Sequence, residues 1–581
     1  MCFFRPGLSM RRGALVPRNE NHKTMTLLGM EREGKMRYRK NRRDACMSKP
    51  NNEPVIVEKP VAEMTAAELD SALALDVERL LRFGRKHKMI KDLDMLVARN
   101  TLLDVLGLSA PCEHKPPKEN FDTPTVILEH MLDLAAAKGL FDNDVPQYRI
   151  NFETRLMGAM MPRESEILRK FRKLYAKKGP QAATDWFYDL CVVSNYIRTA
   201  QIAKNIQWNT KTPYGELEIT INLTKPEKDP KVIAMERLQP AASYPKCMLC
   251  KENIGYAGRI NFPARQTHRL VPVHLAGEDF YLQYSPYAYF HEHCIILHDE
   301  HKPMEMDRRT LAQIFDFVSQ FPHYTCGSNA DLPIVGGSIL SHAHFQGGRY
   351  VFPMQKAGIA TPLRDERYPG VRAGILNWPV STIRLIGRSS QQVQTVANNI
   401  LSAWRQYTDE SADILASTGD TPHNTVTPIL HYDDQDGYIL DLALRNNRTT
   451  EEYPDGIFHP HKEYHNIKKE NIGLIEVMGL AILPARLKEQ GTQIADILCG
   501  LAPNTSREEG SSLAVHADWI DSLIAKYGTS MTPVAANAAV REEIGVVFSH
   551  VLENAGVFKQ DEAGQAAFLR FARSVGFKTV E

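Results

Sequence analysis

Helical periodicity runs through the region after residue 60. A capping box predicts that a helix begins after Thr65, because Glu68 stands three residues later. A second helix is predicted from Thr123, with Pro124 at its first position, to Gly139 just beyond its end. The apolar positions that follow the capping box recur at helical spacing and are predicted core: Leu69, Leu73, Val77 and Leu80.

Further along, the apolar positions alternate as in a strand. Leu217, Ile219 and Ile221 alternate with polar residues, which predicts a strand with one solvated face. From about residue 236 a strand, a helix and an H-x-H motif occur in order, at 294–297, 311–318 and 342–344. A similar order recurs at 382–386, 393–404 and 459–461. We therefore expect a duplicated α+β unit.

Charge and composition divide the chain further. Residues 1–46 hold 12 Lys and Arg against 4 Asp and Glu, and are expected to be a basic, disordered extension. Hydrophobic residues make up 43% and charged residues 24% of the chain, as in a large soluble enzyme. No apolar run is long enough to span a membrane, and no secretory signal is recognisable. The predicted organisation is the following: extension 1–46, mostly helical domain 47–235, first repeat 236–365, second repeat 366–500 and helical region 501–581.

The most informative motif is the H-x-H-x-Q-G-G run at residues 342–348. In a strand, His342, His344 and Gln346 share one face, and the glycines Gly347 and Gly348 allow a phosphate or another backbone to approach. A neutral histidine can attack a phosphoryl group and form a covalent intermediate. A pair of structural strand histidines is the alternative interpretation.

A C-x-x-C motif lies upstream, at Cys247 and Cys250. Two thiolates at this spacing suit a tetrahedral zinc site, although a redox pair or two buried thiols have the same spacing. The histidine-rich stretch 291–301 offers a third ligand, and His342 a fourth. Scattered cysteines of this kind fit a reducing cytoplasm.

Several motifs, in one order, resemble those of the galactose-1-phosphate uridylyltransferase family of the histidine triad superfamily. They are residues 244–253, 261–263, 300–304 and 341–346, and, for the longer second class of that family, 151–158, 219–226 and 458–465. The resemblance implies an α+β fold with duplicated histidine-triad-like antiparallel sheet-and-helix halves and an additional helical N-terminal region. Two neighbours of the nucleophile, Ala343 and Phe345, replace a proline and a glycine of the shorter class.

The resemblance also implies roles for single residues. His344 would be the nucleophile and Gln346 the donor that stabilises the covalent intermediate. A structural Zn²⁺ would be held by Cys247, Cys250, His301 and His342. Asn261 and Asn329 stand where the family contacts uridine and phosphate, and Arg265, with Gly347 and Gly348, completes the expected substrate-binding set. No organic cofactor is expected.

The implied reaction passes a uridylyl group from UDP-glucose to galactose 1-phosphate by a ping-pong route, releasing glucose 1-phosphate and UDP-galactose. We expect a cytoplasmic enzyme of galactose metabolism, a possible homodimer, with neither nucleic acid nor membrane as a partner. Two alternatives remain: another histidine-triad nucleotidyltransferase or dinucleotide polyphosphate phosphorylase, and a non-catalytic zinc-ordered binding protein. His459 and His461 are expected to be structural, and 468–470 a solvated charge run.

Overall fold

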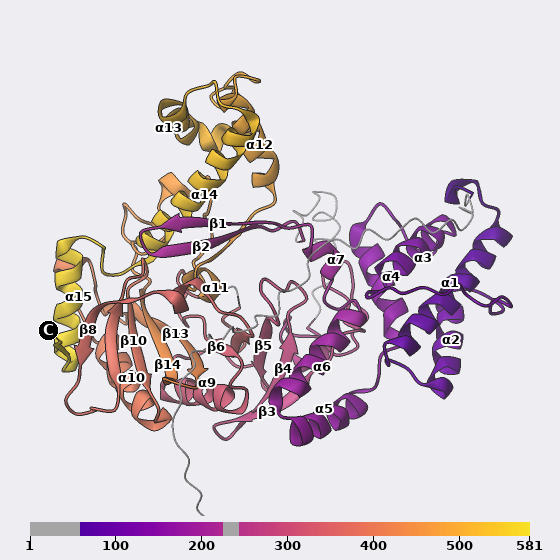
Figure 1. Cartoon of the computed structure of the whole chain (residues 1–581), viewed down its shortest axis with the longest axis horizontal. Coiled ribbons are helices and arrows are strands. Elements are labelled where there is room, and N and C mark those ends of the chain that lie inside the picture. The colour runs from indigo at the N-terminus through magenta and orange to yellow at the C-terminus, as the bar shows by residue number, and fades with distance from the viewer. Residues whose placement is uncertain (1–58, 225–242, 338, 581) are drawn as a thin grey trace, which may run out of the picture. The chain divides into compact units, whose positions relative to one another are not determined.

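An 11-stranded antiparallel sheet organises the protein (Figure 1). The structure is a computed structural model that describes residues 59–224, 243–337 and 339–580, so the predicted extension 1–46 lies outside the described residues. Within those ranges, none of the helices has the length and apolar character needed to cross a membrane. The strands are, in lateral order, β16 (Lys578–Thr579), β8 (Ile359–Arg364), β9 (Arg372–Leu376), β10 (Thr382–Gly387), β14 (Gly437–Asn446), β13 (Asn424–Asp433), β6 (Thr325–Gly327), β7 (His344–Gly348), β5 (Cys294–His298), β4 (Glu278–Tyr284) and β3 (Val271–Leu275).

The sheet consists of two halves with the same topology. Strands β3, β4 and β5, helix α9 (Arg308–Gln320) and strands β6 and β7 are followed by β8, β9 and β10, helix α10 (Ser390–Arg405) and β13 and β14. In the first half the last strand, β7, lies between β5 and β6, and in the second half the last strand, β14, lies between β10 and β13. The halves join where Gly327 of β6 pairs with Ile429 of β13. The predicted duplication of a sheet-and-helix unit is confirmed.

One detail of the predicted repeat is wrong. The strand equivalent to β7 is β14, which ends at Asn446 and contains no histidine. His459 and His461 lie beyond β14, in the segment before the short turn Lys462–Tyr464. The similar spacing of the two H-x-H motifs therefore does not reflect equivalent places in the fold.

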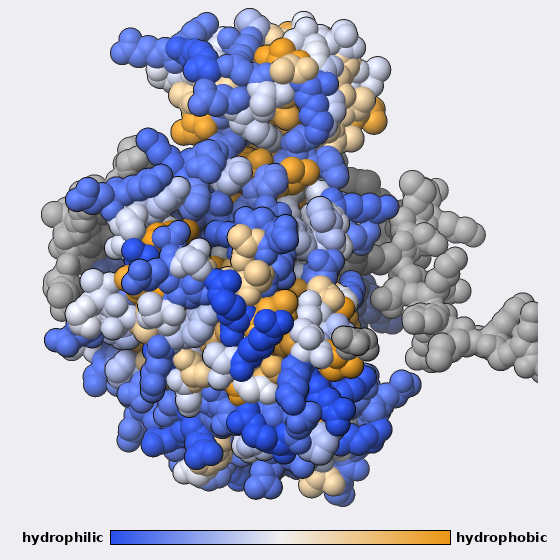
Figure 2. All heavy atoms as spheres, turned by 90° about the vertical axis from the view of Figure 1, so that its left-hand side faces the viewer, coloured by the Kyte–Doolittle hydropathy of each residue, from blue (hydrophilic) through white to orange (hydrophobic). Residues whose placement is uncertain are grey.

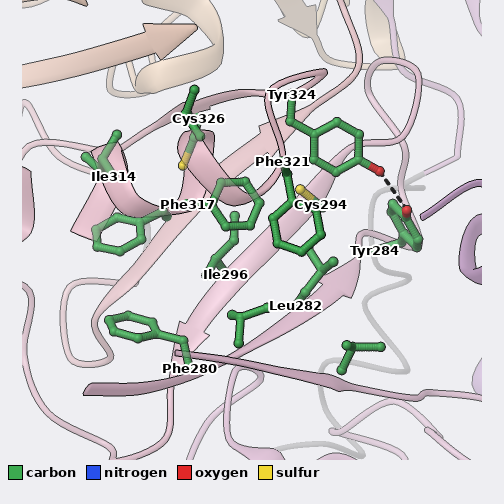
Figure 3. Packing of buried hydrophobic residues seen from close by; sticks show 14 of the residues in the cluster. Phe280, Leu282, Tyr284, Cys294, Ile296, Ile314, Phe317, Phe321, Tyr324 and Cys326 are labelled. Atoms are coloured by element: carbon green, nitrogen blue, oxygen red, sulfur yellow. Dashed lines mark hydrogen bonds between the residues drawn. The ribbon is translucent and has the colours of Figure 1, made fainter. Parts of the chain in front are cut away.

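Helices α9 and α10 cover one face of the sheet. The amphipathic pattern predicted for α9 is confirmed, because Leu311, Ile314, Phe315 and Val318 are all buried. Figure 3 shows Ile314 and Phe317 among side chains of β4, β5 and β6. At the end of this core the Tyr284 and Tyr324 hydroxyls share a hydrogen bond of 2.7 Å.

A second, smaller sheet lies over the other face of the second half. Its strands are β1 (Ile206–Thr212), β2 (Gly215–Ile221) and β15 (Leu480–Leu483), with β15 parallel to β2. They share a hydrophobic core with Ile429 and Ala443 of the large sheet. The helices that follow β14 are α11 (Leu474–Val477), α12 (Arg486–Leu498), α13 (Ala517–Tyr527), α14 (Pro533–Ala555) and α15 (Glu562–Val575).

The predicted strand at 217–223 is confirmed as β2, but its polar face is not solvated. Leu217, Ile219 and Ile221 are buried as expected, and so are Thr220 and Asn222. The reason is tertiary: β2 is the central strand of its sheet, and Asn222, just beyond its end, lines a cleft.

Helices α1 to α7 precede the sheets. The Thr65–Glu68 capping box is confirmed, and the helix predicted from Thr123 begins slightly later, with Pro124 as its N-cap. Gly139 beyond its end has a φ of +78°, which favours glycine. Figure 2 shows the opposite side of the molecule, the one that carries α15, and this face is mostly hydrophilic, with hydrophobic residues in small groups. The helices are α1 (Ala66–Lys86), α2 (Asp92–Leu106), α3 (Thr125–Ala137), α4 (Pro146–Gly158), α5 (Glu164–Lys178), α6 (Pro180–Val193) and α7 (Thr199–Ile202).

Candidate functional site

A cleft of about 810 Å³ opens on the face of β7 that is turned away from α9. Both His344 and Gln346 line it, whereas Phe345 between them points into the α9 core and stacks on Phe280. The period-two geometry of the strand explains this division. The other walls come from 285–295, from Asn329, Gly336, Gly337 and Ile339, and from 468–485.

His344 is held in one tautomer by its own strand. Its Nδ1 lies 2.8 Å from the main-chain oxygen of His342, so Nδ1 carries the ring proton and donates a hydrogen bond to that carbonyl. Nε2 is then the ring nitrogen with a lone pair. The side chain is 6% exposed, and burial lowers the pKa of His344 to about 4. The ring is therefore neutral at pH 7.

Gln346 contacts a second buried histidine. Its Oε1 lies 3.0 Å from Nε2 of His293, the residue just before β5. His293 is 2% exposed, and burial lowers its pKa to about 4. In the described part of the chain the amide nitrogen of Gln346 has no protein partner. That nitrogen can donate to an oxygen in the cleft.

The four predicted zinc ligands come together. The donor atoms of Cys247, Cys250, His301 and His342 all lie within 4.8 Å of one another. The two sulfurs are 3.5 Å apart, and Nδ1 of His342 lies 3.3 Å from the sulfur of Cys247. Nδ1 of His301 lies 3.2 Å from the sulfur of Cys250.

These separations fit a tetrahedral metal centre. Ligand bonds of about 2.0–2.3 Å to zinc place tetrahedral donors roughly 3.3–3.8 Å apart. Nε2 of His342 lies 2.9 Å from the carbonyl oxygen of His298 and donates to it, which leaves Nδ1 to face the thiols. Burial raises the pKa of the Cys247 thiol to about 11. A bound dication would reverse that shift, because it stabilises the thiolate. The group can therefore hold a metal ion.

Three other predicted residues belong to β7 or lie near it. Asn329 lines the cleft and accepts a hydrogen bond from the Leu474 amide at 2.8 Å. Gly347 and Gly348 do not line it. A side chain on Gly347 would lie 2.4 Å from the carbonyl oxygen of Thr325, and one on Gly348 would meet Phe290 and the Glu292 carbonyl. Close packing within the sheet therefore explains why glycine occupies both positions.

Two predicted substrate-binding residues lie apart from the cleft. Asn261 accepts a hydrogen bond of 2.5 Å from Arg259. The guanidinium of Arg265 lies 6.0 Å from the ring centre of Tyr196. Neither Asn261 nor Arg265 is among the residues that line the cleft.

The cleft also contains residues that the sequence reading missed. Lys468, predicted to belong to a solvated charge run, is instead 5% exposed, and its ammonium lies 3.1 Å from the Glu476 carboxylate. Although burial opposes it, Glu476 and Glu470 raise the pKa of Lys468. Both Lys468 and Glu476 line the cleft, together with Asn471. A lysine in a run of charged residues gives no local signal of burial.

Comparison with known proteins gives one consistent result. Models of the N-terminal and C-terminal domains of galactose-1-phosphate uridyl transferase match residues 93–303 and 316–519. A galactose-1-phosphate uridylyltransferase of Caldanaerobacter subterraneus subsp. tengcongensis is 50% identical over 511 residues, which cover 87% of this chain and 98% of that protein. One from Bacillus subtilis is 48% identical over 507 residues, with the same coverage. No solved structure matches significantly. The chain belongs to the galactose-1-phosphate uridylyltransferase family.

Proposed function

We propose that the protein transfers a uridylyl group from UDP-glucose to galactose 1-phosphate through a covalent adduct on His344. The observation that carries the proposal is the hydrogen bond from Nδ1 of His344 to the His342 carbonyl. It directs the lone pair to Nε2 of a buried, neutral ring that lines the cleft. A neutral imidazole nitrogen is the nucleophile that a phosphoramidate adduct requires.

The reaction balances without an external acid or base. Nε2 of His344 attacks the α-phosphorus of UDP-glucose, the bond from that phosphorus to the bridging oxygen breaks, and glucose 1-phosphate leaves. A phosphate oxygen of galactose 1-phosphate then attacks the same phosphorus, the P–N bond breaks, and UDP-galactose forms. Gln346 donates its amide N–H to a phosphoryl oxygen and offsets the charge that gathers there in both steps.

Lys468, Glu476 and Asn471 supply the polar groups for the sugar phosphate. The ammonium of Lys468 can face a phosphate oxygen, and the Glu476 carboxylate can accept hydrogen bonds from sugar hydroxyls. The burial of Lys468 supports this assignment, since an ion pair beside a cleft with its ammonium taken out of water gains from a polar ligand that satisfies the remaining lone pairs and protons.

Zinc is the metal that this donor set suits best. Two thiolates and two imidazoles at tetrahedral spacing are typical of structural zinc sites with four protein ligands. Cys247, Cys250, His301 and His342 would hold the ion, whose chemistry here is to fix the segment that leads into β7. The residue whose carbonyl orients His344 would thereby be fixed as well.

Labelling the donor tests the proposal directly. The protein is incubated with UDP-glucose that carries ³²P in the α-phosphate, and no acceptor is added. We expect acid-labile label on the protein and one glucose 1-phosphate per adduct. The variant His344→Gly should take up no label, whereas His461→Asn, which changes a histidine outside the cleft, should be labelled normally.

The alternatives give different outcomes. A dinucleotide polyphosphate phosphorylase would take label from a dinucleotide donor rather than from UDP-glucose. A non-catalytic binding protein would take label from neither. Absence of both label and glucose 1-phosphate in the wild type would overturn the proposal.

A further inference from the structure

We propose that His293 is a positioning residue, which fixes the side-chain amide of Gln346 with its nitrogen toward the cleft. This inference rests on the proposed function, because it assigns a task to Gln346 in uridylyl transfer. His293 also lines the cleft, but its Nε2 meets Gln346, so we assign it an action through the glutamine rather than a contact with a reacting atom.

The contact is made inside the protein. His293 is buried at the point where the loop from β4 enters β5, and its Nε2 meets Oε1 of Gln346 at 3.0 Å. Its ring lies 4.5 Å from the ring of Phe290 and 5.6 Å from that of Tyr289, centre to centre. These contacts leave the imidazole few alternative rotamers.

The protonation of the pair follows from what each nitrogen can reach. Nδ1 of His293 is buried with no hydrogen-bond partner in the described part of the chain. If Nδ1 carried the proton, a buried N–H would be orphaned, which costs more than an unused acceptor. The proton is therefore on Nε2, which donates a hydrogen bond to Oε1 of Gln346. The amide nitrogen of Gln346 must then face away from His293.

The loop that carries His293 is held by Glu292, the preceding residue, whose backbone has a positive φ. Glu292 has a φ of +55°, a backbone conformation that a glutamate rarely adopts, and it is fully buried. Its carboxylate accepts a hydrogen bond of 2.5 Å from the Tyr324 hydroxyl and pairs with Arg349. Such strain persists only where the surroundings hold the residue in place. The anchored Glu292 thus sets the entry of His293 into β5.

The orientation matters because the two ends of an amide have opposite effects on an anion. With its nitrogen toward the cleft, Gln346 donates to a phosphoryl oxygen. With its oxygen there, it would place a second acceptor against that oxygen and repel it. Without His293, the amide can rotate between both arrangements, and only a fraction of the molecules would present the donor.

The experiment is a double-mutant cycle on the rate of adduct formation in a single turnover with UDP-glucose. His293→Phe keeps the aromatic packing and removes the donor, and Gln346→Ala removes the amide. We expect His293→Phe to slow adduct formation by about tenfold in the wild-type background, part of the roughly hundredfold or larger effect of losing such a donor altogether. In the Gln346→Ala background it should have no further effect.

Two further variants separate positioning from structure. His293→Gln places an amide donor at similar reach and should recover most of the rate. His268→Phe is the matched control, because His268 is also buried and also pairs with a glutamine, Gln283, at 2.6 Å, yet does not line the cleft. It should leave the rate of adduct formation unchanged.

The outcomes are distinguishable. A rate loss from His293→Phe that is equally large with and without Gln346 would overturn the inference, as would no loss at all. If instead the wild-type protein forms no adduct, the proposed function itself is overturned.

Discussion

The main-chain carbonyl of His342 accepts a hydrogen bond from Nδ1 of His344 at 2.8 Å, while Nδ1 of the His342 ring faces the thiols of Cys247 and Cys250. One residue thus connects the metal-binding cluster to the proposed nucleophile. The segment is held on its other side too, since the Ala343 carbonyl accepts from the His298 amide at 2.9 Å. Displacement of the cluster should therefore misplace the His344 ring.

Loss of one cluster ligand should weaken stability and activity together. In Cys250→Ser the alcohol remains protonated and is a poorer zinc ligand than a thiolate. We expect bound zinc, thermal stability and the rate of adduct formation all to fall. Metal analysis, calorimetry and single-turnover rates measure the three. Cys112→Ser, outside the cluster, is the control, and full zinc occupancy in Cys250→Ser would contradict the assignment.

Removal of the proposed nucleophile should abolish transfer and leave the fold intact. His344→Gly empties a buried site at the start of β7, and we expect a loss of about a thousandfold or more in rate, as for other nucleophiles that are removed. Added imidazole can enter the space and take over the attack. The steady-state rate with UDP-glucose and galactose 1-phosphate, with and without imidazole, measures this. Retained activity without imidazole would refute the role of His344.

Gly347 should tolerate no side chain. A Cβ there would lie 2.4 Å from the Thr325 carbonyl oxygen of β6, and backbone cannot move aside cheaply. We expect Gly347→Ala to reduce the free energy of unfolding by about 1–3 kcal/mol, the usual cost of overpacking. Urea denaturation measures it. Gly358→Ala is the control, because nothing lies within 4 Å of that Cβ; equal midpoints for the two variants would contradict the prediction.

Acid should destabilise the protein through its buried histidines. Burial lowers the pKa of His516, whose Nε2 lies 3.1 Å from Gln490, to about 4. Between pH 6.5 and 4 the unfolded chain binds a proton at this histidine and the folded chain does not, so stability is full above pH 6.5 and falls as the pH drops. The slope is about 1.4 kcal/mol per pH unit for each such group. His516→Asn should reduce the slope by up to that amount in urea titrations between pH 7 and 4.5. An unchanged slope would show that His516 does not contribute.

Local patterns predicted the parts of this protein whose partners are near in sequence. The 3.6-residue periods of α9 and α10 and the alternation of β2 each predicted a side that meets the core, and the capping box at Thr65 predicted where a helix begins. The H-x-H-x-Q run likewise placed His344 and Gln346 on one face, because successive side chains in a strand alternate in direction. The C-x-x-C spacing and the later histidines also predicted a cluster of metal ligands.

Long-range contacts decided the rest. Lys468, predicted to belong to a solvated charge run, is instead buried in the cleft beside Glu476, and Asn261 and Arg265 do not line that cleft. His459 and His461 follow β14 instead of matching β7, since spacing alone does not fix which strands pair. The sequence by itself determined the period of each element and which polar side chains share one face of β7. Only the tertiary structure decided which distant residues share the cleft, because burial and partner depend on segments more than a hundred residues apart.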